Sequence, residues 1–312
     1  MTSNIFVGLI QFVLIILISP LVVGVMAKTK ALFRGSIGAS IFQPYYNVCK
    51  LFQKEVVLSD KSSYISKIAP YIVAVVPLTV TGFLPVFDGR VLFSFSGDII
   101  AMVYVLALGT FFLALYGFDQ GSSFGGLGSS REMFVASLAE PAFIMIIFTF
   151  AMQSNSTNIS HIFYSMKGDA FSHFPVSSTL ALLALYFVTL AEAGRIPIDN
   201  PETHLELTMI HEAMILDASG RHLALLELGS FVKTTIFLTL FSNIFMPFGF
   251  YDTTSIATIA ISIAIYVLKM LFLAVIIAFG ELTIAKLRYF RIPDAMMFGF
   301  VLALISMVTY RL

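Results

Sequence analysis

Long apolar runs separated by short polar connections set the pattern of this chain. A hydrocarbon core about 30 Å thick takes roughly 20 helical residues to cross, so each run predicts one membrane-spanning helix. We expect eight of them, at residues 4–27, 68–87, 98–117, 133–153, 176–191, 231–250, 256–280 and 294–310. The pattern therefore predicts an all-α, polytopic integral membrane protein, with residues 1–312 in a single membrane domain.

A shorter amphipathic pattern lies in the first connection, residues 28–67. In "IFQPYYNVCKLFQKE" apolar residues recur at helical spacing, while Lys50, Lys54 and Glu55 fall on the other side. This predicts a short helix at the membrane interface. Two interpretations remain open: a plain surface anchor, or a helix that walls a lateral entrance or docks a partner.

Composition agrees with a membrane protein and narrows the chemistry. The chain is 58% hydrophobic and 12% charged, against about 45–50% and about 25% in soluble domains. The single cysteine, Cys49, excludes a disulfide framework and a cysteine-held iron–sulfur cluster. His204 and His211 have no third ligand at metal spacing, and no nucleotide-binding motif occurs. We therefore expect this chain to bind no metal and no cofactor.

Lysine and arginine gather in alternate connections, which predicts the orientation because cytoplasmic loops keep the excess of these residues. The first, third, fifth and seventh connections contain Lys28, Lys30, Arg34, Lys50, Lys54, Lys61, Lys67, Arg131, Arg195, Arg221, Lys286, Arg288 and Arg291, whereas the rest of the polar segments offer Arg90, Lys167 and Arg311. We expect a multi-pass protein of the cell (inner) membrane with both termini outside. The formal net charge of zero gives no reason to expect a nucleic-acid partner.

The fifth connection, residues 192–230, is rich in acids. Within "AEAGRIPIDNPETHLELTMIHEAMILDASGR" six carboxylates stand against two arginines. Asn200 and Pro201 suit the start of a helix, which puts Glu202 and Glu206 one turn apart on one face, where like charges repel. Apolar residues would cover most of that helix. We favour a polar stripe that faces an internal space and handles protons over a merely solvated face.

Other ionisable residues fall inside the apolar runs. Glu140, Lys269 and, at the end of a run, Glu192 each cost about 2.5–3.5 kcal/mol to insert, which marks them as functional candidates. For Glu281 and Asp98, at run ends, we expect interfacial snorkelling, and Lys233 stays undecided. The glycine-rich segment 121–132 predicts a flexible loop that enters a cavity.

The segment "AEAGRIPIDNPETHLEL", residues 191–207, resembles a signature of the subunit 1 family of respiratory NADH dehydrogenase. That family includes the membrane subunit of hydrogenase-4 and formate hydrogenlyase. The segments "GFDQGSSFGGLGSSRE" and "FQPYYNVCKLFQKE" extend the resemblance, and the first, together with Glu281, is similar to the hydrogenase-type branch. The chain departs from the family pattern at His204, where many relatives have glutamate, and at Asp217, where glutamate is usual.

The resemblance implies a subunit that binds no redox centre and that is non-catalytic or shares a site with its neighbours. Connections 28–67 and 192–230 would hold a peripheral module with iron–sulfur clusters and a nickel–iron site or a quinone. Expected partners are antiporter-like and small membrane subunits, peripheral iron–sulfur and hydrogenase-like large subunits, and the lipid bilayer. The implied proton pathway comprises Glu140, Glu192, Asp199, Glu202, Glu206, Asp217 and Lys269. The implied loop and interface residues are Arg131, Glu132, Arg195, Pro197, Pro201, His204 and Arg221.

Two other functions remain possible from sequence. A quinone-binding subunit of an NADH-quinone oxidoreductase-type complex would use the same cavity for a lipid quinone. An independent secondary transporter would need its own substrate site. The chain shows no internal repeat, which argues against the transporter.

Overall fold

Helices make up the regular structure of the computed structural model, which describes residues 2–166, 176–200, 209–249 and 255–311. Seven helices in these ranges are long and apolar enough to cross a membrane: α1 (Thr2–Phe33), α3 (Tyr64–Thr81), α4 (Asp98–Asp119), α5 (Ser123–Ser154), α9 (Gly220–Phe245), α10 (Ile256–Thr283) and α11 (Ile292–Arg311). The apolar helix α7 (Val176–Glu192), at the position of the fifth predicted span, is shorter than these seven. The prediction of an all-α polytopic membrane protein is confirmed.

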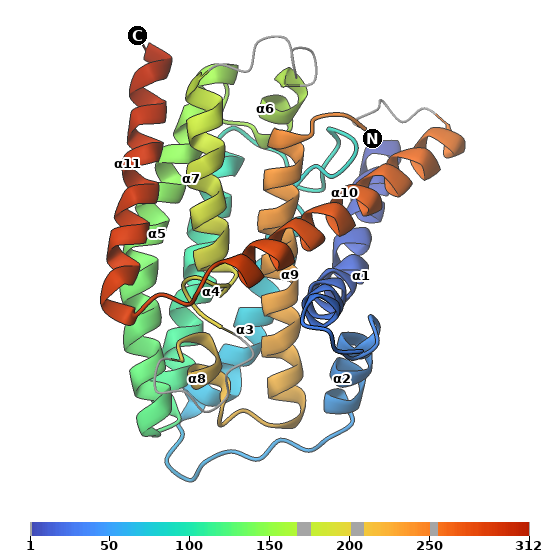
Figure 1. Cartoon of the computed structure of the whole chain (residues 1–312). Helices are drawn as coiled ribbons and strands as arrows, with labels where there is room; N and C mark the ends of the chain where they lie inside the picture. The colour runs from blue at the N-terminus through green and yellow to red at the C-terminus, as the bar shows by residue number, and fades with distance from the viewer. Residues whose placement is uncertain (1, 167–175, 201–208, 250–254, 312) are drawn as a thin grey trace.

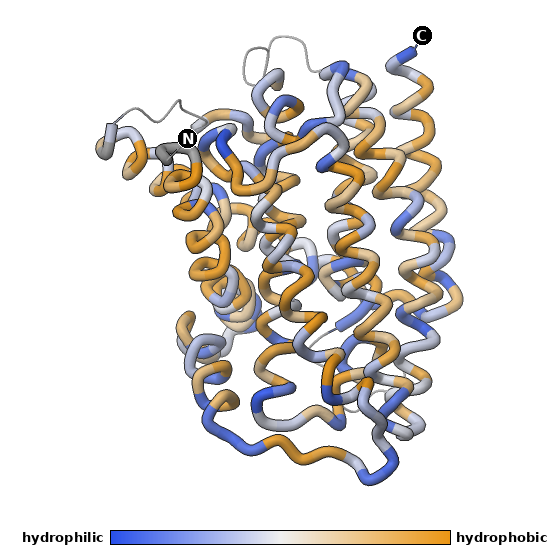
Figure 2. Tube along the Cα trace, turned by 180° about the vertical axis from the view of Figure 1, so that it is seen from behind, coloured by the Kyte–Doolittle hydropathy of each residue, from blue (hydrophilic) through white to orange (hydrophobic). Residues whose placement is uncertain are grey.

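Most of these helices stand side by side as a bundle, and α10 crosses at a slant (Figure 1). Helix α11 packs against α5 and α7, α3 packs against α4 and α9, and α1 packs against α9 and α10. Hydrophobic residues predominate along the helices, while hydrophilic residues gather in the connections (Figure 2). The sequence pattern thus becomes a bundle with an apolar body and polar ends.

The predicted amphipathic helix is present as α2 (Gln43–Phe52). It packs on α1 and α9, with Val48 buried. Gly24 of α1 permits this contact, because a Cβ there would collide with the Ile41 carbonyl oxygen. Helix α2 is therefore fastened to the bundle at the start of the first connection.

The glycine-rich segment is helical, so the prediction of a flexible loop there is wrong. Helix α5 starts at Ser123, and Ser122 caps it by accepting a hydrogen bond from Gly125 N–H. A Cβ at Gly125 would collide with the Gly117 carbonyl oxygen of α4, and one at Gly128 would lie 2.8 Å from the Ile210 carbonyl oxygen. The glycines serve close packing of α5 against its neighbours rather than flexibility.

The acid-rich connection is shorter than expected because α9 begins at Gly220 rather than at residue 231. Its part before α9 includes the short helix α8 (His211–Ile215). The apolar residues Met209, Ala213 and Met214 are 0–3% exposed. Met214 packs into a small second core with residues of α3, α4 and α9. This end of the connection is thus packed into the protein instead of lying on it.

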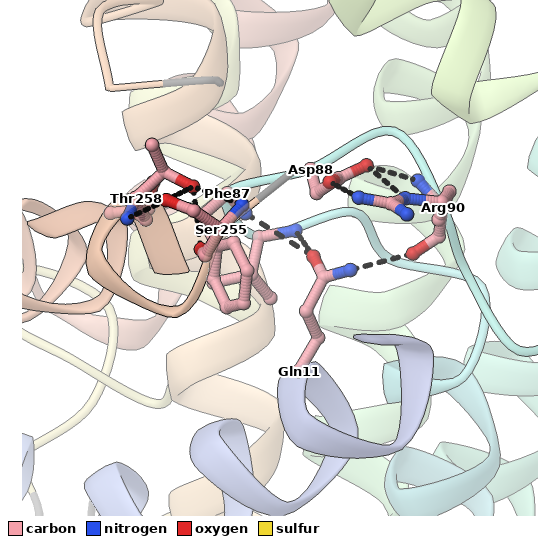
Figure 3. Close-up of polar contacts among 8 residues, drawn as sticks. Gln11, Phe87, Asp88, Arg90, Ser255 and Thr258 are labelled. Atoms are coloured by element: carbon pink, nitrogen blue, oxygen red, sulfur yellow. Dashed lines mark hydrogen bonds and ion pairs between the residues drawn. The ribbon is translucent and has the colours of Figure 1, made fainter. Parts of the chain in front are cut away.

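The connection from α3 to α4 closes the opposite end of the bundle. We expected the second apolar run to stay helical to residue 87, but α3 ends at Thr81, and Pro85 further on lacks the N–H that a helix needs. Residues 83–88 are nonetheless buried. Gln11 of α1 accepts hydrogen bonds from the Val86 and Phe87 N–H groups, and it donates to the Arg90 carbonyl at 2.6 Å (Figure 3). The side chain of Gln11 therefore accepts hydrogen bonds from backbone N–H groups that lie outside any helix and are buried away from solvent.

Two further contacts fix the same end. The Asn243 side chain of α9 donates to the Pro85 carbonyl at 2.6 Å. Asp98 accepts from the Ile159 N–H at 2.8 Å and from the Asn158 side chain at 3.0 Å, which holds the start of the short helix α6 (Ile159–Ser165). The end opposite the acid-rich connection is therefore closed by buried, hydrogen-bonded chain.

Candidate proton-transfer site

Helix α7 ends in a motif that turns the chain inward. Gly194 has a φ of +57°, its N–H donates to the Ala191 carbonyl at 3.1 Å, and the Arg195 N–H donates to the Leu190 carbonyl at 2.9 Å. Glycine suits this left-handed position because it has no Cβ. Arg195 is consequently directed into the protein, where it is 7% exposed.

An ion pair joins the end of α7 to α9. The Lys233 ammonium lies 2.7 Å from a Glu192 carboxylate oxygen, and it donates to Thr110 Oγ1 of α4 at 3.2 Å. Glu132 and Glu140 of α5 both lie within electrostatic reach of Lys233 and Glu192. One cation from α9 therefore balances a group of acids contributed by two other helices.

A small cavity of about 40 Å³ reaches this ion pair. It is lined by Glu192, His211 and Lys233, together with Thr110 and apolar residues of α3, α4 and α9. A water needs roughly 10–15 Å³ of such space and two to four polar partners. The cavity therefore has room and hydrogen-bonding partners for a few waters beside Glu192.

A second buried charge cluster joins three elements. Glu281 of α10 lies 2.9 Å from the Lys30 ammonium of α1 and 3.7 Å from the Arg195 guanidinium. The Glu281 side chain is 0% exposed and that of Lys30 is 3% exposed. Burying charge is costly unless it is paired. One carboxylate here compensates two cations.

Asp199 lies near the start of the acid-rich connection and is 2% exposed. It accepts hydrogen bonds from the Asn200 N–H at 2.8 Å and the His211 N–H at 2.9 Å. Lys286, which follows α10, lies 3.4 Å from the same carboxylate. Asp199 thus connects residues 193–200, at the beginning of the acid-rich connection, with the start of α8.

A larger cavity of about 200 Å³ lies between α1, α9 and the acid-rich connection, and Lys30, Arg195, His211, Glu212 and Glu227 contribute to its wall. Burial raises the pKa of Glu212 to about 7, with the Asp199 charge adding to the rise and Arg195 opposing it. Burial also lowers the pKa of His211 to about 4, against the attraction of Asp199. At neutral pH His211 is therefore uncharged, and Glu212 is populated in both its protonated and its ionised form.

The structure brings Glu140, Glu192, Asp199 and Glu132 of the predicted set into this charged region, but Lys269 lies apart. The Lys269 ammonium donates to the Met246 carbonyl at the end of α9 and lies 4.5 Å from the centre of the Phe248 ring. Met246 and Lys233 are thirteen residues apart on α9, which corresponds to roughly 20 Å along a helix. Lys269 therefore contacts the opposite end of α9.

Of the other predicted site residues that the structure describes, some are exposed on the surface and some hold the chain in place. Asp217 and Arg221 are exposed, away from the buried acids. Arg131 donates to the Met209 carbonyl at 3.1 Å, which attaches the segment before α8 to α5. The Ile196–Pro197 peptide bond is cis. Residues 201–208 lie outside the described part of the chain, and they include Pro201, Glu202, His204 and Glu206. The helix start expected at Asn200–Pro201 falls at the edge of that segment.

The expectation of interfacial snorkelling is wrong for both residues to which we applied it. Glu281 is 3% exposed and Asp98 is 0% exposed. Each is held inside by partners from other elements: Lys30 and Arg195 for Glu281, and the start of α6 for Asp98. A charged residue at a helix end turns inward when a neighbouring element supplies a buried partner.

Sequence reasoning missed several members of the charged region: Lys30, Glu212, Glu227, Lys286 and the role of Lys233. A signal for Lys233 was present, because Glu227 and Lys233 both interrupt the apolar pattern of what proves to be one helix. Among the described residues, no group of three or more His, Cys, Asp and Glu side chains is arranged to hold a metal ion.

Comparison with known proteins gives matches over nearly the whole chain. The family model described as NADH dehydrogenase matches residues 5–311. Hydrogenase-4 component C of Escherichia coli (strain K12) is 33% identical over 301 residues, which covers 96% of this chain and 94% of the relative. Formate hydrogenlyase subunit 4 of the same organism is 30% identical over 305 residues, covering 96% and 97%.

More distant matches agree. A subunit of the NADH-quinone oxidoreductase of Paraburkholderia xenovorans (strain LB400) is 25% identical over 265 residues, which covers 80% of this chain and 72% of the relative. A chain of the membrane-bound sulfane sulfur reductase, an archaeal respiratory membrane complex, superposes with a TM-score of 0.83 over 98% of this chain and 99% of that chain. At 17% identity, this last match shows a shared fold.

The fold and these relatives define the class of protein as a multi-pass membrane subunit of complex I-like or hydrogenase-type oxidoreductases. The chain belongs to the NADH dehydrogenase subunit 1 family.

Proposed function

We propose that this chain is the ion-translocating membrane subunit of a complex similar to hydrogenase-4. In this proposal its connections 28–67 and 192–230 anchor a peripheral redox module, and its buried carboxylates link that module to antiporter-like membrane subunits. The iron–sulfur clusters, and a nickel–iron site or quinone, belong to other subunits. The chain lies in the cell membrane with both termini outside and the acid-rich connection in the cytoplasm.

The ion pair between Glu192 and Lys233 carries the proposal. Glu132 of α5 lies within electrostatic reach of both members of the pair and of Asp199 in the acid-rich connection, and Glu140 lies within reach of the pair. Glu132 and Glu140 are eight residues apart, so they extend this row of ionisable groups by roughly 12 Å along α5. The row leads from the connection into the bundle.

Stability alone is a weak reason for such a row. A buried ion pair often contributes no more than a well-packed apolar pair of the same volume. An ionisable residue in a membrane helix costs about 2.5–3.5 kcal/mol on insertion scales. Proton exchange among closely spaced acids, beside cavities with room for water, supplies the functional reason to keep them.

The test is Glu192→Gln in the assembled complex, with ions translocated per redox turnover measured in closed inside-out vesicles. We expect the ratio to fall about a hundredfold, the low end of the contribution of a positioned proton-transferring side chain, while redox turnover continues. Asp294→Asn, which neutralises an exposed acid at the start of α11, is the matched control and should keep the ratio. An unchanged ratio in the Glu192 variant would reject the proposal.

The orientation has its own test. Reporter fusions at residues 60, 125, 210 and 286 are expected to give cytoplasmic signals, and fusions near 92, 165 and 252 external ones, because of the lysine and arginine distribution. A cytoplasmic signal at 165 would contradict it.

A quinone-binding role is the alternative, and the cavity of about 200 Å³ is the observation that favours it. Val23, Ala27 and Phe231 contribute apolar wall opposite the charged residues. Quinone-site inhibitors distinguish the two functions. Inhibition of turnover that is lost when Phe231 is changed to Ala would support quinone binding.

A further inference from the structure

The described stretch of the acid-rich connection nearest α7 is attached to the end of α10 at three points. Arg195 lies 3.7 Å from Glu281, and Asp199 lies 3.4 Å from Lys286. Between them, the Leu287 N–H donates to the Pro197 carbonyl at 2.9 Å. Residues 195–199 therefore follow the position of residues 281–287, which lie some ninety residues later in the chain.

The chemistry of the first attachment differs from that of a surface salt bridge. Glu281 is shared by two cations, with Lys30 the closer at 2.9 Å and Arg195 at 3.7 Å. All three side chains are at most 9% exposed, so water screens their charges little. Without the carboxylate, Lys30 and Arg195 would lose the partner they share, and Arg195 would lose its attachment to α10.

The second attachment reaches the proposed proton path directly. Lys286 pairs with Asp199, and Asp199 accepts the His211 N–H that begins α8. His211 in turn lines the small cavity beside Glu192 and Lys233. The position of the chain after α10 thus sets where Asp199 and His211 stand relative to Glu192.

We propose that Glu281 and Lys286 are positioning residues that clamp the segment 195–199 to the end of α10. Glu281 acts as a fixed counter-ion, shared by α1 and the acid-rich connection, and not as a carrier of the translocated ion. This inference rests on the proposed function, because the clamp matters for coupling only if the acids it holds move ions. It extends that function by assigning the α10 end a role in keeping the path assembled.

The decisive experiment compares Glu281→Gln with the double variant Lys30→Met/Glu281→Gln in the assembled complex. Counting the described residues alone, the single variant removes the one carboxylate that Lys30 and Arg195 share, whereas the double variant restores the wild-type net charge of these three positions. We expect ions translocated per turnover to fall about fivefold or more in the single variant. In the double variant the ratio should recover to roughly half of the wild-type value, because the effects of substitutions at residues in contact are not additive. If Glu281 carried the ion itself, the double variant would be as inactive as the single one, and that result would overturn the proposal.

Hydrogen–deuterium exchange of peptides that cover 193–200 and 284–290 supplies a readout independent of pumping. Exchange should rise about tenfold in Glu281→Gln, the factor expected for loss of roughly 1.4 kcal/mol of local stability, and return toward wild type in the double variant. Unchanged exchange in the single variant would overturn the clamp. If the wild-type complex moves no ions, the proposed function fails, while the exchange result still decides whether the clamp exists.

Lys286 provides a second route should Glu281→Gln fail to assemble. Lys286→Met should raise exchange over residues 193–200 and lower the pumping ratio, whereas Lys286→Arg, which keeps the charge, should restore both. Arg291→Met, which neutralises an exposed cation nearby in the chain, should leave both unchanged. Equal behaviour of the Met and Arg variants at 286 would contradict an electrostatic clamp.

Discussion

Lys233 donates to a hydroxyl, pairs with one carboxylate and lies within electrostatic reach of two more. That arrangement places one ammonium group near three carboxyl groups at the end of α7 and on α5. The side chains of Lys233 and Glu192 are 18% and 9% exposed, so solvent compensates little when either charge is lost. At the scale of the residue, the site is a set of charges that depend on one another.

We predict that Lys233→Met destabilises the assembled protein by about 3 kcal/mol, the low end for breaking a buried pair by removing one partner. The cause is the unpaired Glu192 carboxylate. Adding Glu192→Gln to Lys233→Met should cost little more, because the stranded charge is then gone. Thermal denaturation of the purified complex measures both, and fully additive losses would show that the pair is not coupled.

Glu212 gives a pH dependence. Its pKa is raised to about 7 by burial, with Asp199 contributing, so the folded protein holds this proton more tightly than the unfolded chain does. Stability from this group is therefore fully present below about 4.5 and declines as pH rises through about 7. We predict that the wild-type complex loses the stability that comes from this group between about pH 4.5 and 7, and that Glu212→Gln removes this part of the loss.

Infrared difference spectra give the direct check. A protonated-carboxyl band that titrates near pH 7 should be present in the wild type and reduced in Glu212→Gln. If the variant keeps the same stability profile and the same band, Glu212 does not hold the proton.

At the scale of the element, apolar runs predicted which helices exist but not where several of them begin. Glu227 interrupts the apolar pattern ahead of residue 231, so the first turns of α9 were assigned to the connection. The glycines at the start of α5 suggested a loop from sequence. In the structure they are helical, and they allow α4 and α8 to approach α5 closely. Helix boundaries here depend on neighbours that a single sequence does not reveal.

The two α5 glycines at 126 and 128 make a matched pair. A Cβ at Gly128 would lie 2.8 Å from both the Ile210 carbonyl oxygen and the Ala213 Cβ, whereas a Cβ at Gly126 meets nothing within 4 Å. We predict that Gly128→Ala destabilises the complex by about 1–3 kcal/mol through overpacking, and that Gly126→Ala is neutral or stabilises by up to about 1 kcal/mol through helix propensity. Thermal denaturation of the two variants compares them, and equal effects would contradict close α5–α8 packing.

At the scale of the whole molecule, the two ends of the bundle differ in chemistry. One end gathers Asp199, Glu192 and Lys233 beside two cavities whose walls include charged residues. The other is closed by buried residues 83–88, held by Gln11 and Asn243. This asymmetry fits a path that opens at the acid-rich end and does not run straight through the chain.

Part of that site was predictable and part was not. Glu140 and Glu192 were found from sequence because each interrupts an apolar run, and the family signature marked Asp199 and Arg195. Lys30 and Glu281 belong to α1 and α10, whose adjacency is a property of the folded bundle alone. Lys269 was marked by the same rule as Glu140, but its ammonium contacts the end of α9 instead.

The central claim is that acids at separate points of the chain carry one ion path coupled to redox turnover. The measurement that tests it most directly is ions translocated per electron transferred, in closed vesicles that contain the assembled complex, for Glu140→Gln and Glu206→Gln side by side. Glu140 lies in α5 within electrostatic reach of Glu192, and Glu206 belongs to the acid-rich connection. We predict that both variants keep substantial redox turnover and lose translocation, with Glu202→Gln milder. Normal translocation per electron in either variant would contradict the account and leave the acids as a docking surface.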